Sequence, residues 1–313
     1  MKTKKILGQV VGIAVGVAAL YFSVKNVNSA ELKASFDALR WIYIVPIIVL
    51  NFGVVALKAL RWRYMLRPVK DIEFFTIFKA ITIGFMANNI LPARLGEVLR
   101  IHILGKDADI SRVSTTASLV SDKILEAISL LFLAALLVIF SGVPHWLHYA
   151  LTVTLLITVI AYTLAAIYSG RDINNKFMVK FQCGIKGLRH WKMFSMGLFV
   201  SFISWFLQLV MIYLTQEAYG VQLPFWGTFL VIIAVNMAIA VPGTPAHVGT
   251  FEFACILAYA FFGVDKSLGL LIGATYHIVQ VIPITIVGGI IMLVDQASSF
   301  RTAALTRDQD TAG

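Results

Sequence analysis

Long apolar runs recur along the chain, and short polar segments that carry most of the charges separate them. A helix needs roughly 20 apolar residues to cross a bilayer core about 30 Å thick. The pattern therefore predicts an all-α, polytopic integral membrane protein. We interpret six runs as full transmembrane helices: Ile6–Val24, Trp41–Leu57, Ala117–Phe140, Leu147–Tyr168, Met193–Leu214 and Leu268–Val294.

Two other apolar segments are interrupted by residues that break or polarise a helix. The first, Phe74–Leu91, ends in Asn88-Asn89 and is followed by Pro92. The second, Trp226–Phe262, is divided by Pro-Gly-Thr-Pro-Ala-His-Val-Gly at 242–249. Each unpaired backbone group costs several kcal/mol in hydrocarbon, so non-helical chain at membrane depth persists only where protein buries it or where it lines a wet cavity. We therefore expect two re-entrant hairpins that enclose a polar cavity.

Composition and charge fix the broad class and the orientation. With 59% hydrophobic and only 13% charged residues, the chain contains no large soluble catalytic domain. Its 26 Lys and Arg outnumber its 16 Asp and Glu. Because these cations lie between apolar runs, they indicate orientation and contact with anionic lipid headgroups, and they do not indicate nucleic acid as a partner.

The positive-inside rule places both termini in the cytoplasm of a plasma-membrane protein. An even number of crossings is then required at each interrupted segment, so the two hairpins enter from opposite sides. We expect one transmembrane domain over residues 1–300 and a short disordered tail over 301–313. The other segments expected in the cytoplasm are 58–70, 94–112 and 171–192.

The first apolar run has two interpretations. Its basic start at residues 1–5 and the small residues at 28–30 are typical of a cleaved signal peptide. Against this, the apolar run is longer than the usual signal core, and Gly8, Gly12 and Gly16 give it a face for helix packing. We favour a retained helix.

The two interrupted segments share a short pattern. Residues 92–96 and 245–249 both read Pro-Ala-x-x-Gly, and Glu97 and Glu252 follow them. Opposed broken helices at corresponding places are typical of inverted-repeat transporters, which build a site at the membrane midplane. An inverted repeat is therefore one hypothesis. The alternative is coincidence, because Pro, Ala and Gly are common wherever membrane helices break.

The first break carries the strongest candidate binding residues. Arg94, Glu97 and Arg100 follow one another at i, i+3 and i+6 and so share one side of a helix. A guanidinium can hold a phosphate through two donors, and a carboxylate can bind an ammonium group. Asn88 and Asn89 lie just before the break and would line the same site. The alternative is a solvated interfacial ion pair.

Further polar residues lie inside apolar spans. Asp122 and Glu126 share one face of a span, where charges usually meet a pathway or a partner. The alternative is an interfacial cluster in which the neighbouring lysine snorkels to the surface. His247 lies at the second break and His277 lies within the last span; such a histidine is either a proton relay or an interhelical hydrogen-bond partner.

The chain lacks the residue spacings of a metal site, a nucleophile elbow or a phosphate loop. We therefore expect no enzyme activity and no cofactor. Without a nucleotide-binding motif, any transport would run downhill or be driven by a gradient.

Three stretches resemble, in order, the signatures of the lysylphosphatidylglycerol synthase transmembrane region family: Asn-Asn-Ile-Leu-Pro-Ala-Arg-Leu-Gly-Glu-Val-Leu-Arg at 88–100, Ser-Asp-Lys-Ile-Leu-Glu at 121–126, and Pro-Gly-Thr-Pro-Ala-His-Val-Gly-Thr-Phe-Glu at 242–252. The resemblance covers nearly the whole chain. That family includes the flippase half of the multiple peptide resistance factor, which moves aminoacylated phosphatidylglycerol between leaflets. The resemblance implies a lipid translocase.

The chain also departs from that family. It lacks the soluble aminoacyl-transferase domain of the bifunctional members, so synthesis of lysyl lipid is not implied. It has Asp122-Lys123 where Glu-Arg is frequent, Ala246-His247 where two glycines are frequent, and His277 where an arginine is frequent. These changes put the lysyl headgroup in doubt and admit polyprenyl-phosphate-linked sugars.

The sequence thus predicts a translocase for a lipid with an anionic or zwitterionic headgroup. In this hypothesis Arg94 and Arg100 hold the phosphate, while Glu97 and Glu252 contact a cationic or hydroxylated part. One alternative is a non-transporting membrane partner of a lipid-modifying enzyme or glycosyltransferase. A second alternative is a small-solute transporter.

Overall fold

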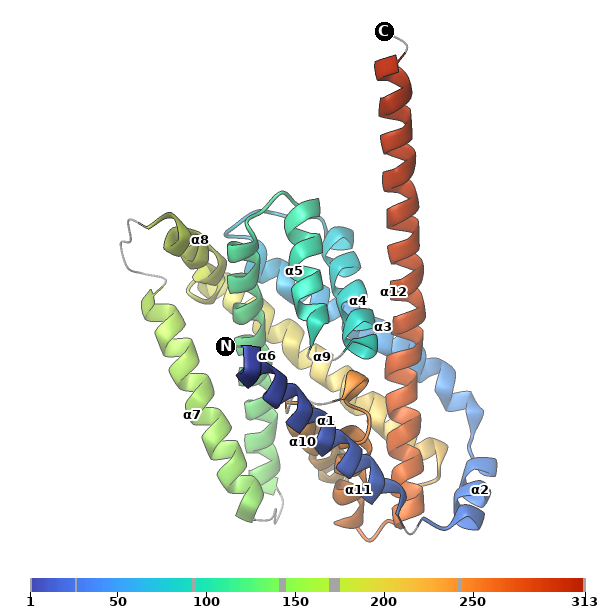
Figure 1. Cartoon of the computed structure of the whole chain (residues 1–313). Helices are drawn as coiled ribbons and strands as arrows, with labels where there is room; N and C mark the ends of the chain where they lie inside the picture. The colour runs from blue at the N-terminus through green and yellow to red at the C-terminus, as the bar shows by residue number, and fades with distance from the viewer. Residues whose placement is uncertain are drawn as a thin grey trace.

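The computed structural model describes residues 2–25, 27–91, 94–140, 145–168, 175–240 and 244–311, and every regular element in these ranges is helical (Figure 1). The elements are α1 Lys2–Val24, α2 Ser29–Asp37, η1 Trp41–Tyr43, α3 Ile44–Leu66, α4 Phe74–Ile90, α5 Leu95–Asp107, α6 Arg112–Phe140, α7 His145–Tyr168, α8 Lys176–Ile185, η2 Lys186–Leu188, α9 Trp191–Ala218, α10 Phe225–Ala240, η3 Pro245–His247, α11 Thr250–Ala260 and α12 Lys266–Thr311.

The prediction of an all-helical membrane protein is confirmed for the described residues. Among the described residues, three helical stretches are long and apolar enough to cross a membrane: Trp41–Leu66, Trp191–Ala218 and Lys266–Ala297. Shorter apolar helices cover Gly12–Val24, Phe74–Ile90, Thr152–Ala165 and Trp226–Ile239.

Helices α3 and α12 extend past the residues at which we expected them to end. We ended the second span at Leu57 and placed Arg61 in a loop, whereas α3 continues to Leu66. The charged residues of this last part remain in the bundle because acidic side chains of α6 pair with them, as described below. The last helix, α12, continues through residues 301–311, which we expected to be a disordered tail. Its Ala, Leu, Arg and Gln residues are good helix formers, and no proline occurs there.

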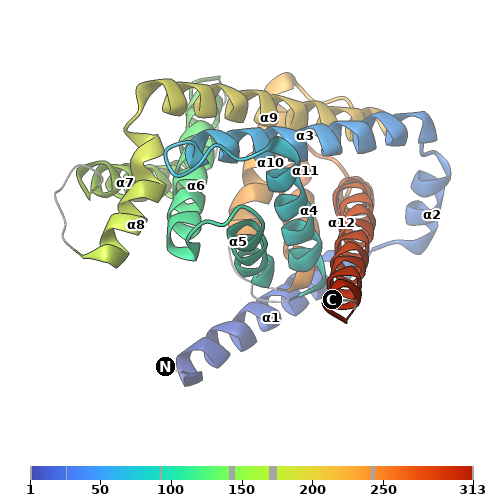
Figure 2. The same cartoon turned by 90° about the horizontal axis from the view of Figure 1, so that it is seen from above.

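Helices α3 and α9 pack side by side and run in opposite directions, and they form one wall of the molecule (Figures 1 and 2). Each is followed by a pair of shorter helices and then by a longer helix: α4, α5 and α6 follow α3, while α10, α11 and α12 follow α9. The pairs also exchange partners, because α4 packs on α12 and α10 packs on α6. The two halves of the chain therefore interlock.

The helix pairs α4–α5 and α10–α11 approach one another from opposite ends of the bundle (Figure 1). Their breaks meet: α4 contacts η3, and Arg94 donates a hydrogen bond from its guanidinium to the carbonyl oxygen of Ile239. The turn residues Pro92, Pro242 and Gly243, on which the sequence argument relied, lie outside the described residues.

Glycine at position 96 is what allows α4 and α5 to approach. A Cβ atom at Gly96 would lie 1.9 Å from the carbonyl oxygen of Gly84 and 2.5 Å from Oδ1 of Asn88. No side chain can occupy that space, because backbone atoms cannot withdraw as a flexible side chain would. The first helix pair therefore closes only with glycine here.

Asn51 of α3 repairs a defect in α12. Pro283 lies within α12 and has no N–H, so the carbonyl oxygen of Val279, four residues earlier, loses its helical partner. Asn51 donates from Nδ2 to this oxygen at 3.2 Å and to the carbonyl oxygen of Gln280 at 3.1 Å. One turn further along, Asn89 donates to Oγ1 of Thr285 at 2.9 Å. Amide side chains of α3 and α4 thus hold the proline turn of α12.

Replacing Asn51 by alanine should therefore destabilise the protein by about 1–3 kcal/mol, because a buried carbonyl loses its donor. The measurement is thermal unfolding in detergent. Asn236→Ala is the matched control, since the partner of Asn236 among the described residues is the carbonyl of Ile232 in its own helix. An Asn51→Ala cost no larger than that of Asn236→Ala would contradict the repair of α12.

Candidate functional site

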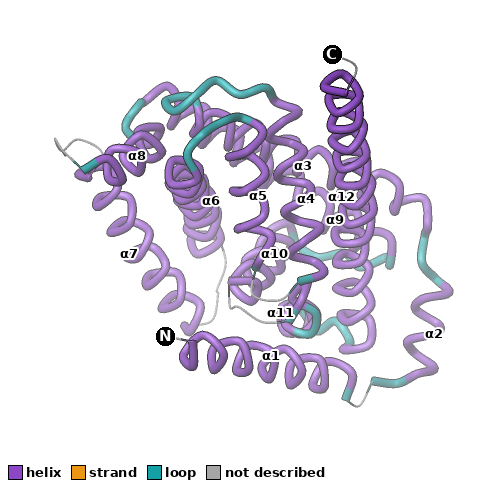
Figure 3. The backbone as a smooth tube through the Cα atoms, turned by 45° about the horizontal axis from the view of Figure 1, so that its top comes forward, coloured by secondary structure: helices purple, strands orange, loops and turns teal. Residues whose placement is uncertain are grey.

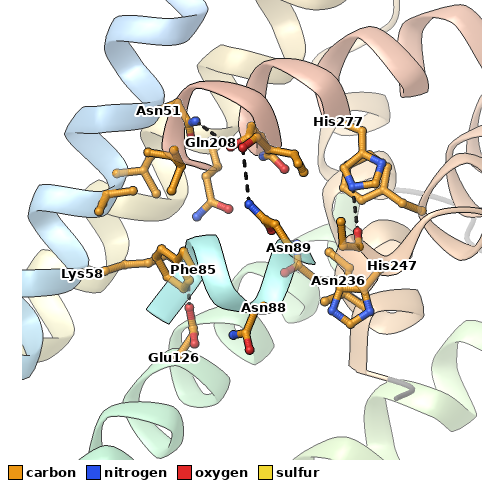
Figure 4. A pocket seen from close by; sticks show the side chains of 18 of the residues that line it. Asn51, Lys58, Phe85, Asn88, Asn89, Glu126, Gln208, Asn236, His247 and His277 are labelled. Atoms are coloured by element: carbon orange, nitrogen blue, oxygen red, sulfur yellow. Dashed lines mark hydrogen bonds and ion pairs between the residues drawn. The ribbon is translucent and has the colours of Figure 1, made fainter. Parts of the chain in front are cut away.

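A cavity of about 450 Å³ lies where the two breaks meet (Figure 4). Residues of α3, α4, α5, α6, α7, α9, α10, α11, α12 and η3 line it. Most of the predicted site residues reach it. Those that line it are Asn88, Asn89, Arg94, Glu97, Glu126, His247 and His277.

The other three predicted residues lie behind the lining. Arg100, Asp122 and Glu252 are buried and are absent from the cavity wall. Each instead contacts a residue nearer the cavity, and these contacts decide how the wall is built.

Asp122 holds a buried arginine that we had assigned to a loop. Arg61 donates from Nε to Oδ1 of Asp122 at 2.6 Å and from Nη2 to Oδ2 at 3.0 Å. It also donates from Nη1 to Oγ of Ser201 at 3.3 Å. The Arg61 side chain is only 2% exposed. This two-pronged geometry is the arrangement in which a guanidinium is best held away from water.

Glu126 lies close to three basic side chains, and two of them, Lys58 and Lys123, line the cavity. Its Oε1 accepts from Nζ of Lys58 at 2.7 Å and lies 3.5 Å from Nη2 of Arg61, while its Oε2 lies 3.0 Å from Nζ of Lys123. Lys123 is half exposed and also lies 3.9 Å from Oε1 of Glu97. The acidic residues of α6 therefore organise basic side chains at the cavity wall, and the snorkelling alternative describes Lys123 only in part.

Glu97 pairs with Arg100 and not with Arg94. Arg100 forms an ion pair with Oε2 of Glu97, and its guanidinium lies 5.2 Å from the ring centre of Trp62. Arg94 adopts the left-handed conformation, with φ 55°, and is directed to Ile239. Arg94 and Glu97, which we expected to share one side of a helix, both reach the cavity but have different partners.

The charges around the first break do not cancel. Five cations face three carboxylates in this group, which leaves an excess of two positive charges. The cations are Lys58, Arg61, Arg94, Arg100 and Lys123, and the carboxylates are Glu97, Asp122 and Glu126. A cavity with walls of low dielectric and an excess of one sign attracts the opposite sign, so this site favours an anion.

At the second break, His277 joins α12 to α11 and η3. Its Nδ1 lies 2.6 Å from Oε1 of Glu252, and its Nε2 lies 2.8 Å from the carbonyl oxygen of Ala246. The other carboxylate oxygen of Glu252 accepts from the backbone N–H of Gly249 at 2.7 Å, which caps α11. The ring of Phe251 stacks on His277 at 4.1 Å. Figure 4 shows the His277 side chain directed from α12 toward the second break.

Oδ1 of Asn88 and Nδ1 of His247 are buried atoms of the wall that have neither a hydrogen-bond partner nor an ion pair among the described residues. Figure 4 places both side chains at the edge of the cavity. Burying an unpaired polar atom costs about 1–3 kcal/mol, so such atoms usually meet water or a ligand. No cluster of three or more metal-ligating side chains occurs in the described part of the chain.

Comparison with known proteins assigns the family. Residues 9–288 match the family described as lysylphosphatidylglycerol synthase TM region. The chain belongs to this family. The resemblance seen in the sequence is confirmed, and the family's description links this membrane protein to lipid metabolism.

Relatives that the chain matches over most of its length are named only as UPF0104 membrane proteins. A UPF0104 membrane protein of Methanothermobacter thermautotrophicus is 25% identical over 291 residues, which cover 82% of this chain and 86% of that protein. A UPF0104 membrane protein of Methanocaldococcus jannaschii is 23% identical over 220 residues, which cover 66% of this chain and 93% of that protein. Neither name states an activity.

Sequence reasoning missed Lys58, Arg61, Asn51 and Gln208 as site residues of this family member. Lys58 and Arg61 stand at i and i+3, and Asp122 and Glu126 stand at i and i+4, so two charged faces of opposite sign were available to match. We instead placed both cations in a cytoplasmic loop, because the positive-inside rule favours lysine and arginine there. Asn51 and Gln208 gave no signal, because isolated amides are common in membrane helices.

The Arg61–Asp122 pair gives a stability prediction. Asp122→Ala should cost about 3–5 kcal/mol, because it leaves a buried guanidinium without its carboxylate. The double variant Arg61→Met with Asp122→Leu should recover much of that loss, since it removes both charges. Chemical denaturation of the wild type, Asp122→Ala and the double variant provides the measurement.

The exposed pair Arg63–Asp71, at 3.3 Å, is the matched control. Asp71→Ala should cost about 0–1 kcal/mol, as expected for a surface pair. Equal costs at Asp71 and Asp122 would show that the Arg61 pair is not buried in the folded protein.

Proposed function

We propose that this protein is a lipid translocase, which moves a phospholipid or a polyprenyl-phosphate-linked lipid between leaflets while its headgroup passes through the cavity. The observation that carries the proposal is the excess of positive charge in a cavity placed where two opposed helix breaks meet. Such breaks are tolerated in a membrane only when protein or a wet cavity satisfies them.

The lengths of the paired helices support re-entrant hairpins. At 1.5 Å per residue, the 17 residues of α4 and the 16 residues of α10 reach about 26 Å and about 24 Å. The 13 residues of α5 and the 11 residues of α11 reach about 20 Å and about 17 Å. All are shorter than a bilayer core of about 30 Å. The interlocked order of the two halves further supports an inverted repeat.

The lining suits a phosphate-bearing headgroup. Lys58, Arg94 and Lys123 line the cavity and carry fixed donors, while Glu97 and Glu126 could meet a hydroxyl or an ammonium group. Arg100 has a different part in this proposal from the one the sequence suggested, because its contact with Glu97 orients that carboxylate.

A second hollow favours a lipid over a small solute. It has a volume of about 460 Å³, lies between α5, α6 and α7, and shares Arg94, Glu97 and Lys123 with the cavity. The rest of its lining is mainly apolar and includes Leu119 and Ile157. Figure 3 shows α7 set apart from α5 on this side. A polar cavity beside a mainly apolar hollow, with lining residues in common, offers separate places for a headgroup and its acyl chain.

The proposal predicts the orientation of the chain. Residues 94–112 and both termini should be cytoplasmic, with the two hairpins entering from opposite sides. The measurement is labelling of single cysteines with an impermeant reagent, in a background that lacks Cys183 and Cys255. Cysteines at Ser111 and Lys186 should react only after the membrane is opened, and one at Lys33 should react in intact cells. External labelling at Ser111 would overturn the first hairpin.

Transport should depend on the cavity cations. Lys123→Gln should lower the rate of lipid movement about 10-fold or more, because a charge-assisted bond to phosphate contributes about 1.5–3 kcal/mol. Arg94→Lys should also move lipid more slowly than the wild type, since an ammonium lacks the two parallel donors of a guanidinium. The measurement is movement of labelled lipids in proteoliposomes, at matched protein amounts and with folding checked by thermal unfolding.

Lys106→Gln is the matched control, because Lys106 is exposed at the end of α5 and lies outside the cavity wall. It should transport at the wild-type rate. Wild-type rates in both cavity variants would reject the proposed site. The alternative is a non-transporting membrane partner. It would be favoured if the wild type moves no lipid and if cells that carry either substitution grow as wild-type cells do.

A further inference from the structure

The contacts of His277 fix how many protons the second break holds. The carbonyl oxygen of Ala246 only accepts hydrogen bonds, so Nε2 of His277, 2.8 Å away, must carry a hydrogen. The 2.6 Å contact with Glu252 needs a second hydrogen, either on Nδ1 of a charged imidazolium or on the carboxyl oxygen. In both forms the pair is neutral overall and holds one proton that it can lose.

Loss of that proton breaks one of the two bonds. A neutral His277 beside an ionised Glu252 has one N–H for two acceptors. If Nε2 keeps the hydrogen, a ring lone pair faces the carboxylate; if Nδ1 takes it, the carbonyl of Ala246 loses its donor. Each outcome removes one of the two hydrogen bonds by which His277 joins α12 to the second break.

The bond to Ala246 restrains a strained segment. Ala246 and His247 have φ values of 50° and 62°, in the left-handed region that residues with a side chain rarely occupy. Such conformations persist only where surrounding contacts hold them. Glu252 also caps Gly249, so the same carboxylate fixes the start of α11. The tip, residues 244–249, therefore depends on the pair for its shape.

The pair has access to water and few competing charges. His277, Ala246 and His247 all line the cavity, so a released proton can leave through it. The ring of Phe251 stacks on the imidazole and excludes water from that face. The other titratable or charged groups around the pair are His247 on η3, Arg94 at the first break, Cys255 on α11 and Tyr276 on α12.

We propose that Glu252 and His277 form a proton-binding site that latches the tip to α12. When the proton leaves for the cavity water, the tip is released and the cavity wall that Ala246 and His247 form is free to open. The latch itself stands on this geometry alone. Its coupling to lipid movement rests on the proposed function.

Glu252→Gln imitates the protonated state. The amide can donate one N–H to Nδ1 of a neutral His277, whose Nε2–H still reaches Ala246, and the amide oxygen can still accept from Gly249. This variant should keep the tip latched at every pH. His277→Leu removes the latch altogether, and a failure of that variant to fold leaves the comparison of wild type with Glu252→Gln intact.

The measurement is hydrogen exchange of residues 244–252 in the full-length protein in lipid nanodiscs, expressed as protection factors so that the intrinsic pH dependence of exchange is removed. The range runs from about pH 5 to about pH 9 and brackets the ordinary pKa of histidine, about 6.5. Wild-type protection should fall about 10-fold or more as the pH rises, which corresponds to about 1.4 kcal/mol.

Glu252→Gln should stay protected throughout. Glu217→Gln is the matched control, because Glu217 lies 3.8 Å from Arg40 at another part of the molecule. It should behave as the wild type does. Protection of the wild type that does not change with pH would overturn the latch, as would an equal fall in Glu252→Gln.

Transport in proteoliposomes of matched pH separates the latch from the proposed function. With a labelled phosphatidylglycerol, the wild-type rate should rise with the opening of the tip, and Glu252→Gln should keep the low-pH rate. If the tip opens with rising pH but the protein moves no lipid, the latch is supported and the translocase is rejected. If the protein moves lipid but the tip never opens, the translocase is supported and the latch is rejected.

Discussion

The structure depends on one constraint: the chain breaks helical hydrogen bonding twice in the middle of an apolar bundle, and the freed polar groups must find partners there. The two breaks solve this together. Arg94 of the first break donates to Ile239 just before the second, and α4 packs against η3. The polar cavity is the space that remains between them, so the site is a consequence of how the breaks are satisfied.

Helix α12 is the element that both breaks share. Asn89 donates to it beside the first break, and His277 reaches from it to the second. Between these points Pro283 removes a helical hydrogen bond, and Asn51 of α3 takes its place. Proline is a common cause of kinks in helices, and here side chains of α3 and α4 supply the donors around it. Helix α12 thus contacts both breaks, and Pro283 lies between these contacts.

The sequence predicted the parts of this arrangement that follow from periodicity and local chemistry. Apolar length gave the helices, and the polar run at Asn88-Asn89 and the residues at 245–249 gave the breaks. What it could not give is pairing across helices. Arg61 has the same sequence signature whether it lies in a basic loop or opposite Asp122, and only the packing of α3 on α6 decides between them. Arg94 and Glu97 likewise share a helix turn but have different partners in space.

The two breaks differ in the kind of charge they carry, and this difference gives the proposed cycle a direction. The first break holds a formal excess of two positive charges, because five lysine and arginine side chains face three carboxylates. The second break holds the Glu252–His277 pair, which is neutral with its proton and negative without it. The groups of the two breaks together therefore have a formal excess of two positive charges when the tip is latched and of one when it is released. An anionic headgroup should be bound more tightly in the latched state and less tightly once the wall can open, so proton release would loosen the headgroup at the same step that frees its exit.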